Sequence, residues 1–247
     1  MGCQSRPAVR YQGLSVKDVV IIPVFHRIDY IEQCFNSLLN ARGIDGKRVW
    51  VFQDNRRGAP DIKPVQKLVL DLVPKFPNSR FWLLDPHDEV GFLNNTHYAL
   101  SRAWDSGAEK IYYIEDDVVV TRDFFEWHDA VQADGDWMCS SAWRPPAGVM
   151  TPQHAEEYYF KVQFPTTISI GTCFKRDKLK IALQTHDWNP QDRMLAENWQ
   201  CVMPYVQRCF HVGSKSCHPG SNGCPPEAVD VVSDPIPDYR TQKVVLR

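Results

Sequence analysis

Three adjacent carboxylates, Glu115, Asp116 and Asp117, directly follow the apolar run Ile111–Ile114. A run of this kind is typical of a buried strand, so the acids are expected at a strand end. Neighbouring carboxylates repel one another when they are partly desolvated, and a cation or a hydrogen-bonded ligand offsets that repulsion. Hard divalent ions such as Mg2+ and Mn2+ take carboxylate oxygens and share them with substrate phosphates. The pattern therefore predicts a metal-assisted diphosphate site.

Two other interpretations of reactive residues stay open. The three acids could form a solvated acidic turn, because the motif is short. The chain's last part could hold a disulfide in an oxidising compartment, or zinc, although the spacing of its residues fits no standard zinc pattern. The residues concerned are Cys209, His211, Cys217, His218 and Cys224.

Alternating strands and helices are predicted in the first half, where apolar runs give way to apolar residues at helical spacing. The expected strands are Val19–Val24, Val49–Phe52, Phe81–Leu84 and Lys110–Ile114. The expected helices run from Asp29 through Leu39, from Pro64 through Leu72, and from Asn95 or Thr96 through Trp104. Asp29 is expected to cap the first of these helices.

This alternation indicates an α/β fold with a mainly parallel central sheet flanked by helices, of the Rossmann-like kind. Ligands of such sheets bind beyond the carboxyl ends of the strands. The polar segments His26–Arg27, Gln53–Arg57 and Glu115–Asp117 follow three of the predicted strands. Their common position favours a nucleotide site at that edge.

The second half is less regular. A short helix is expected at Asp123–Ala130, a strand at Thr166–Phe174, a helix from Asp177, and a helical stretch at Met194–Tyr205. The residues after His211 include many Gly, Pro and Ser, which predicts loop.

Bulk properties indicate an ordinary globular chain. Its 247 residues fit one α/β domain, and a net charge of -2 gives no electrostatic indication of nucleic acid or membrane surfaces. Since no run of about 18 apolar residues occurs, no membrane span is predicted, and the N-terminus lacks the apolar core of a signal peptide. We expect a soluble, cytoplasmic protein, or a Golgi-lumen protein if an N-terminal anchor has been removed.

Neither a Gly-rich dinucleotide motif nor a P-loop lysine motif occurs in the chain, which argues against dinucleotide enzymes and P-loop kinases. A parallel first half, an acidic strand end and an aromatic-rich second half instead suggest a nucleotide-sugar enzyme. Such chemistry needs a metal to neutralise the leaving diphosphate and a general base for the acceptor hydroxyl.

Four stretches, in order, resemble the GT-A-fold N-acetylglucosaminyltransferases that initiate hybrid and complex N-glycans, and their protein-O-mannose relatives. Glu115–Glu126 resembles the segment E-D-D-L-x-x-x-x-D-F-F of that family. The other three are Val24–Arg27 with Tyr30–Leu39, Gln53–Asp54, and His97–Leu100. The resemblance implies one GT-A domain over 1–247, with a nucleotide-sugar half at 17–120 and an acceptor half carrying the catalytic base at 121–247.

The resemblance also implies roles on the nucleotide side. Arg27 would contact the nucleotide, Asp54 would accept the uracil N3–H, and His97 would lie near the uridine. Separately, Ser214 lies in a segment that could close over the diphosphate as a loop or remain a solvated tail.

On the sugar side, Glu115 and Asp116 would bind sugar and ribose hydroxyls. Asp117 would be the direct protein ligand of Mn2+ or Mg2+, with diphosphate oxygens and water completing the shell. Glu197 stands where the family has the first acid of Asp-Asp-Trp, its catalytic base, so it would deprotonate the acceptor hydroxyl for an in-line, inverting attack. This chain departs from the family there, because Asn198 replaces the second acid and the longer acceptor domain has no clear counterpart.

The resulting hypothesis is a metal-dependent, inverting glycosyltransferase with a UDP-sugar donor, UDP-GlcNAc being implied by the resemblance alone. Its acceptor could be a glycan, a glycoprotein or another hydroxyl, including that of a hydroxymethylated DNA base. A nucleotidyltransferase is a second class, although the Gly-rich loop and lysine it usually needs are missing after the first strand. A non-catalytic sugar-nucleotide binder is a third.

Overall fold

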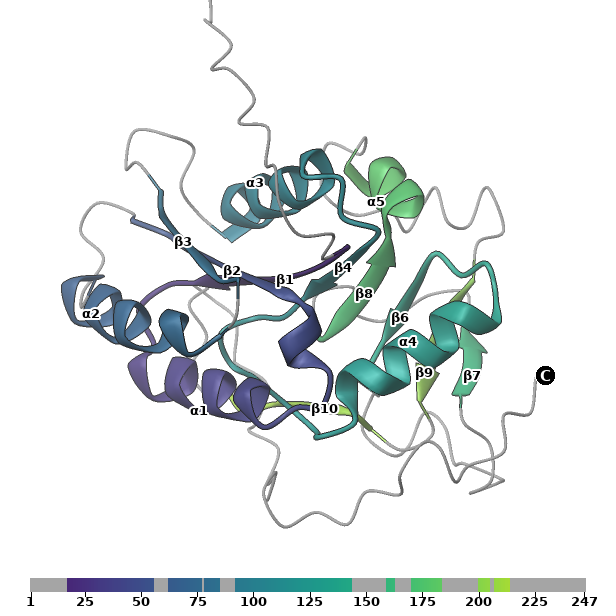
Figure 1. The fold of residues 1–247 in the computed structure, drawn as a ribbon, viewed down its shortest axis with the longest axis horizontal. Helices are drawn as coiled ribbons and strands as arrows, with labels where there is room; N and C mark the ends of the chain where they lie inside the picture. The colour runs from purple at the N-terminus through teal and green to yellow at the C-terminus, as the bar shows by residue number, and fades with distance from the viewer. Residues whose placement is uncertain are drawn as a thin grey trace, which may run out of the picture.

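The computed structural model describes residues 17–55, 62–76, 78–84, 92–143, 159–162, 170–183, 200–204 and 207–213. They form an α/β fold in which helices cover both faces of a central sheet (Figure 1). The strands are β1 (Asp18–Val24), β2 (Arg48–Gln53), β3 (Arg80–Leu83), β4 (Lys110–Tyr113), β5 (Val118–Val120), β6 (Cys139–Ser141), β7 (Tyr159–Val162), β8 (Thr172–Lys175), β9 (Cys201–Pro204) and β10 (Cys209–His211). The helices are α1 (Ile28–Leu39), α2 (Ile62–Leu72), α3 (Phe92–Asp105), α4 (Phe124–Asp134) and α5 (Arg176–Leu183), with short 3-10 helices η1 (Ile44–Gly46) and η2 (Val73–Lys75).

The central sheet has the strand order β3-β2-β1-β4-β8-β6-β9-β7 across the described ranges. Strand β1 pairs in parallel with β2 and β4, and β2 pairs in parallel with β3. Strand β8 is antiparallel to both β4 and β6. The chain adds strands on one side of β1 as far as β3 and then crosses to the other side for β4. The gap beyond the carboxyl ends of β1 and β4 is therefore the topological switch point, where sheets of this kind bind ligands.

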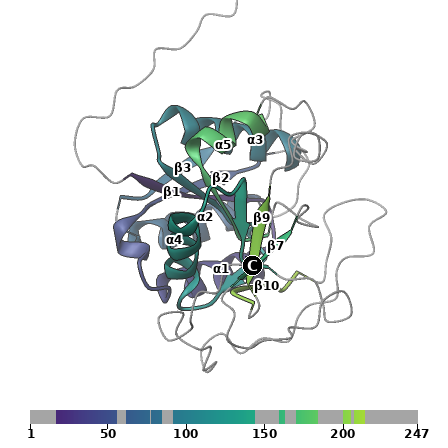
Figure 2. The ribbon, with the colours of Figure 1, turned by 90° about the vertical axis from the view of Figure 1, so that its right-hand side faces the viewer.

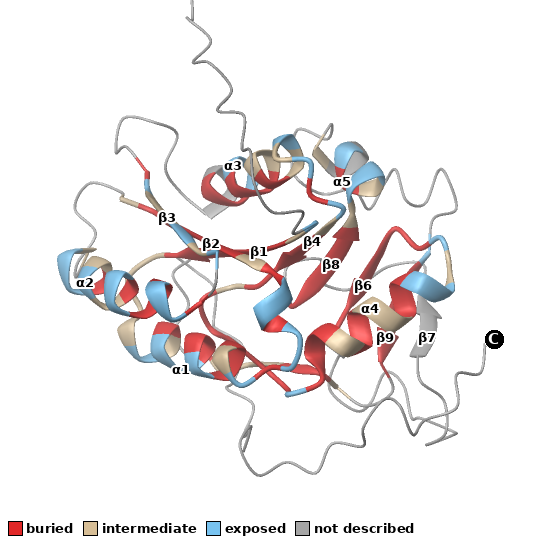
Figure 3. Ribbon diagram, in the orientation of Figure 1, coloured by how far each residue is buried: buried red, intermediate tan, exposed pale blue. Residues whose placement is uncertain are grey.

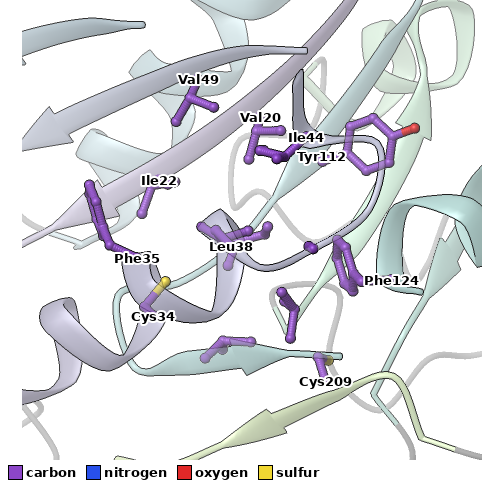
Figure 4. Close-up of a cluster of buried hydrophobic side chains, with 14 of the residues drawn as sticks. Val20, Ile22, Cys34, Phe35, Leu38, Ile44, Val49, Tyr112, Phe124 and Cys209 are labelled. Carbon is purple, nitrogen blue, oxygen red and sulfur yellow. The ribbon is translucent and has the colours of Figure 1, made fainter. Parts of the chain in front are cut away.

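Alternate residues of β1 contribute to two hydrophobic cores. Val20 and Ile22 pack in the core formed with α1, α2 and α4, whereas Val19 and Ile21 pack in the core formed with α3 and α5. Figure 4 shows part of the first core, with Phe35 of α1 close to Ile22. Because both faces of the sheet are covered, strands β1, β2, β4, β6, β8 and β9 are buried almost throughout (Figure 3), which explains the continuous apolar runs of β1, β2 and β4. Strand β3, at the end of the sheet, is half-buried to exposed.

The predicted alternation of the first half is confirmed, with differences at the helix starts. Helix α1 begins at Ile28 with Arg27 at its N-cap position, so the prediction of Asp29 as the cap is wrong. Asp29 lies in the first turn, where a carboxylate still interacts favourably with the helix dipole. Helices α2 and α3 begin somewhat before Pro64 and Asn95.

The helix predicted at Met194–Tyr205 is wrong at its end, because Cys201–Pro204 forms strand β9 between β6 and β7. A short apolar run does not distinguish a buried strand from a helix by periodicity, and here the two neighbouring strands decide the outcome. Residues 191–199 lie outside the described part. The predicted helices at Asp123–Ala130 and from Asp177 are confirmed as α4 and α5. The strand predicted at Thr166–Phe174 is confirmed at its end as β8, and residues 166–169 lie outside the described part.

A second sheet, which the sequence did not predict, pairs β5 with β10 in antiparallel fashion. His211 of β10 lies opposite Val118, and Cys209 lies opposite Val120. Strand β10 lies on the α1 side of the central sheet (Figure 2), and Val118 and Val120 of β5 pack in the core that contains residues of α1. Every helix in the described ranges is too short or too polar to cross a membrane.

Helix α4 carries a buried polar cluster on its inner face. The Nδ1 atom of His128 lies 2.7 Å from Ser140 Oγ, and Gln132 Nε2 donates to the same oxygen at 2.9 Å. Burial lowers the pKa of His128 from its ordinary value of 6.5 to about 3. The imidazole is therefore neutral in the folded protein at any ordinary pH.

Acidification is expected to destabilise the fold through His128. In the unfolded chain this imidazole is protonated below about pH 6.5, whereas in the folded chain it is protonated only near pH 3. The contribution of His128 to stability is therefore fully present above about pH 6.5 and is lost as the pH falls below that value. Between pH 7 and pH 5 the free energy of unfolding should fall by about 2 kcal/mol from this group. Urea unfolding gives the free energy of unfolding of the wild type and of His128→Gln at pH 7 and pH 5. The difference between the two proteins should shrink by about this amount at the lower pH. A difference independent of pH would contradict the assignment.

Candidate active site

The acidic segment lies directly beyond β4, at the switch point. The backbone N–H of Val118 donates to the Glu115 carbonyl at 3.1 Å and closes the turn that contains Asp116 and Asp117. Asp116 is 3% exposed and Asp117 is 2% exposed, whereas Glu115 is half-buried. The alternative of a solvated acidic turn is therefore wrong for the two aspartates, which lie inside the protein.

Arg27 joins the two buried carboxylates. It follows β1, the strand next to β4, and its guanidinium donates from Nη1 to Asp117 Oδ2 and from Nη2 to Asp116 Oδ1. The backbone N–H of Phe25 donates to the other Asp116 oxygen at 3.1 Å. Arg27 and the acids are far apart in sequence but meet because they follow neighbouring parallel strands, β1 and β4. Their common position after strands in the sequence predicted this meeting.

His211 also contacts Asp117, from β10. Its Nε2 atom lies 3.1 Å from Asp117 Oδ2, and the backbone N–H of Val212 donates to the Asp117 carbonyl at 2.9 Å. The next residue, Gly213, passes so close that a Cβ atom there would lie 2.3 Å from Asp117 Oδ2. Two distant parts of the chain, at Arg27 and at His211–Gly213, therefore converge on the carboxylate of Asp117.

The two aspartates differ in charge state. Burial raises the pKa of Asp116 to about 6, against the opposing charge of Arg27, and the negative charge of Asp117 adds to the increase. Burial acts in the same direction on Asp117, but the hydrogen bond from His211 and the charge of Arg27 outweigh it, so the Asp117 pKa is lowered. Asp117 is consequently an ionised carboxylate at neutral pH, as a ligand of a hard cation must be.

The surroundings of Asp117 fit a divalent cation. Its Oδ1 atom is buried and has no hydrogen-bond partner within the described ranges, and the same holds for His211 Nδ1. Buried polar atoms are normally satisfied, so an unpaired carboxylate oxygen points to a missing ligand. No group of three His, Cys, Asp or Glu side chains in the described part is arranged to hold a metal. An ion here would take its other ligands from water and from a substrate's phosphate oxygens.

Gly213→Ala is expected to weaken Mn2+ binding about 10–100-fold, the usual effect of disturbing the partners of a metal ligand. The added Cβ must push the Asp117 carboxylate away from His211, since Asp117 Cγ would also lie only 2.9 Å away. Gly46→Ala is the matched control, because no atom lies within 4 Å of a Cβ at that position. Titration with Mn2+ measures both affinities, and an unchanged Kd in Gly213→Ala would contradict the close approach.

Of the four remaining predicted residues, the structure describes Asp54 and His97. Asp54 is buried directly after β2, and its backbone N–H donates to the Val24 carbonyl at 2.9 Å, which places it at the same edge beside β1. His97 is exposed on α3. Glu197 and Ser214 lie outside the described residues. Roles for these four residues stay predictions.

His211 is the functional residue that sequence reasoning did not assign to this site. It was considered only in a zinc cluster with cysteines of the last part of the chain. Cys209 of that set is buried, and its thiol donates to the Ile170 carbonyl at 3.8 Å. Cys217, His218 and Cys224 lie outside the described ranges. The sequence shows that Cys209 and His211 are two residues apart, as side chains on one face of a strand are. It does not show which strand β10 pairs with, and therefore does not place His211 beside Asp117.

No protein-family model and no curated protein matches the sequence. Many solved structures are similar. TarS from S. aureus, in complex with UDP-GlcNAc, has a TM-score of 0.58 at 15% identity, over 83% of this chain and 60% of that one. The mannosyltransferase PcManGT from Pyrobaculum calidifontis, in complex with GDP-Man and Mn2+, has a TM-score of 0.56 at 18% identity, over 81% of this chain and 58% of that one. The chain has the GT-A fold.

The GT-A fold confirms the fold class predicted from strand–helix alternation. It also explains why the acids lie at the switch point, since β1 and β4 occupy neighbouring positions in the parallel part of the sheet. The chain spans about three fifths of the length of the TarS fragment and of PcManGT.

Proposed function

We propose that this chain is a metal-dependent glycosyltransferase that moves a sugar from a UDP-sugar to an acceptor hydroxyl. The observation that carries the proposal is the buried pair Asp116 and Asp117 at the switch point, with one Asp117 oxygen left without a partner in the described part. Two proteins of the same fold support it, because TarS was solved with UDP-GlcNAc and the mannosyltransferase PcManGT with GDP-Man and Mn2+.

Asp117 is the protein ligand of the divalent ion, Mn2+ or Mg2+, and His211 lies beside it as a second donor. When bound, the ion supplies positive charge that stabilises the leaving diphosphate. Arg27 keeps the two carboxylates in place by donating to both, so that Asp117 stays ionised and correctly oriented. In the proposed site the guanidinium of Arg27 also contacts the nucleotide, a role that rests on the family resemblance.

The donor's hydroxyls and base are recognised by the remaining polar residues of the edge. Glu115 and Asp116 accept hydrogen bonds from sugar and ribose hydroxyls; with a pKa near 6, Asp116 is mostly ionised at pH 7 and so accepts them well. Asp54 accepts the uracil N3–H, and its position beside β1 suits a base bound across the ends of β1 and β2. His97 contacts the uridine.

Glu197 is the general base, which takes the acceptor proton as the hydroxyl attacks the anomeric carbon opposite the diphosphate, with inversion. Ser214 lies in the segment that closes over the diphosphate. Both assignments rest on the sequence alone. The donor sugar N-acetylglucosamine rests on the resemblance to the N-acetylglucosaminyltransferases.

A glycan or glycoprotein acceptor follows from the same resemblance. A hydroxymethylated DNA base is the alternative acceptor, although a net charge of -2 gives no general attraction to nucleic acid. Transfer assays on both acceptor classes at low and high salt distinguish them, because binding to DNA weakens steeply as salt increases.

A thermal-shift panel of nucleotides and nucleotide sugars, with and without Mn2+, tests the proposal first. A ligand at about 100 times its Kd should stabilise the fold by about 2.7 kcal/mol. We expect a Mn2+-dependent shift with UDP and UDP-sugars, and its absence for every nucleotide would contradict the proposal. Release of UDP in the presence of an acceptor distinguishes a transferase from a non-catalytic binder, and release of pyrophosphate would indicate a nucleotidyltransferase.

A further inference from the structure

A buried ion pair lies immediately before β10, outside the contacts that the proposed reaction uses. The side chain of Arg208 is fully buried, and its Nε donates to Asp123 Oδ2 at 2.9 Å. Asp123, 3% exposed, precedes α4, and its other oxygen accepts from Thr121 Oγ1 at 2.7 Å. The pair therefore connects the turn after β5 with the residue before β10.

Stability alone is a weak reason for such a pair. Removing an arginine and an aspartate from water costs several kcal/mol per ion, and apolar side chains of similar volume are often as stable or more so. The best attested use of a buried polar contact is to fix one register among several. A register is at stake here, because β10 has only three residues and pairs with β5, a strand far away in the sequence.

The pairing of β5 with β10 has contacts at both ends. At one end, the backbone N–H of Thr121 donates to the Arg208 carbonyl at 3.0 Å, and at the other Val212 donates to the Asp117 carbonyl at 2.9 Å. Between them His211 lies opposite Val118. A shift of one residue would turn every side chain of β10 to the opposite face, and His211 would leave Asp117.

We infer that the Arg208–Asp123 pair sets the register of β10 on β5 and thereby positions His211 against Asp117. Arg208 is in this sense a positioning residue, which acts through His211 and touches neither donor nor metal. The geometry is specific, because an arginine one residue earlier or later would start from the other face of the strand. The part that concerns metal affinity rests on the proposed function.

The Mn2+ affinity of the full chain tests this inference, measured from the spin-resonance signal of free Mn2+ in a titration. Arg208→Met and His211→Ala are each expected to weaken binding about 10–100-fold. In the double variant the loss should not exceed that of His211→Ala alone, because Arg208 acts only through His211. Arg208→Lys should recover part of the affinity, since it keeps a positive charge beside Asp123.

Lys47→Met is the matched control. Lys47 is another buried cation, with Nζ 3.2 Å from Asp18 Oδ2 and 3.3 Å from Asp129 Oδ2, but it lies at the opposite edge of the sheet, where β1 begins. Its loss is expected to lower the Tm and leave the Kd for Mn2+ unchanged. Wild-type affinity in folded Arg208→Met, or losses that add fully in the double variant, would overturn the inference. If Arg208→Met does not fold, Asp123→Asn takes its place in the same comparison.

A second measurement is independent of metal. In the metal-free protein, the ring signals of His211 in a proton–nitrogen NMR spectrum report its contact with Asp117. Arg208→Met is expected to shift them and to leave those of His128 in place, and unchanged His211 signals would overturn the inference. If the wild-type protein does not bind Mn2+, the metal part of the proposed function fails, while this spectrum still decides the register.

Discussion

Asp117→Ala is expected to abolish nearly all metal-dependent sugar transfer while the fold is retained. A bound divalent ion contributes several kcal/mol to the transition state for loss of a diphosphate, so kcat/KM should fall about 10³-fold or more. The fold should survive because Arg27 keeps Asp116 as a partner. Transfer of a radiolabelled sugar over a range of Mn2+ concentrations, together with a circular-dichroism melt, measures both results.

Asp29→Ala is the control for this prediction. Asp29 is an exposed acid in the first turn of α1, close in sequence to Arg27 and outside the proposed site. Its loss should leave activity within a factor of about two, as for other surface substitutions. Full activity in Asp117→Ala would place the metal elsewhere and remove the central assignment of the site.

Glu197→Gln is expected to lower kcat about 10²–10⁴-fold, the usual scale for removing a general base. The amide has nearly the same shape but cannot accept the acceptor's proton at neutral pH. Donor binding should be retained, because in the proposed site the nucleotide contacts residues at the ends of β1, β2 and β4 rather than Glu197. Single-turnover rates and a separate donor Kd from thermal shift distinguish the two effects.

Glu126→Gln provides the same chemical change at a position without a catalytic role. Glu126 pairs with Arg42 at 2.7 Å on the surface side of α4, and its replacement should leave kcat unchanged. An unchanged kcat in Glu197→Gln would move the base to another residue. A large loss of donor affinity instead would mean that Glu197 contacts the donor rather than the acceptor.

The parallel part of the sheet was predictable because its connections are local. Each of β1 to β3 is an apolar run followed by a helix with its own apolar face, and β4 is the apolar run that follows the last of these helices. Crossovers of this kind leave little choice of topology. The antiparallel part was not predictable to the same degree. The position of β9 between β6 and β7 depends on pairing with strands far away in sequence, and the short run Cys201–Pro204 does not by itself indicate that pairing.

The candidate site likewise has one part that was predictable from the sequence and one part that was not. The meeting of Arg27 with Asp116 and Asp117 follows from a general rule, because residues that end neighbouring parallel strands share one edge. His211 reaches Asp117 through β10, and no rule derived from local pattern pairs three residues near position 210 with three residues near position 119. The place of His211 in the site therefore follows only from its observed contact with Asp117.

The wide sequence separation of the contacts around Asp117 has a consequence for how the protein is made. A ribosome delivers the four parallel strands first, and their short-range crossovers allow the sheet to form early. The carboxylate's last neighbours, His211 and Gly213, emerge much later. We expect an arrested nascent chain that ends before residue 207 to hold the early sheet without binding Mn2+ tightly, so that competence for metal is acquired only in the final phase of synthesis.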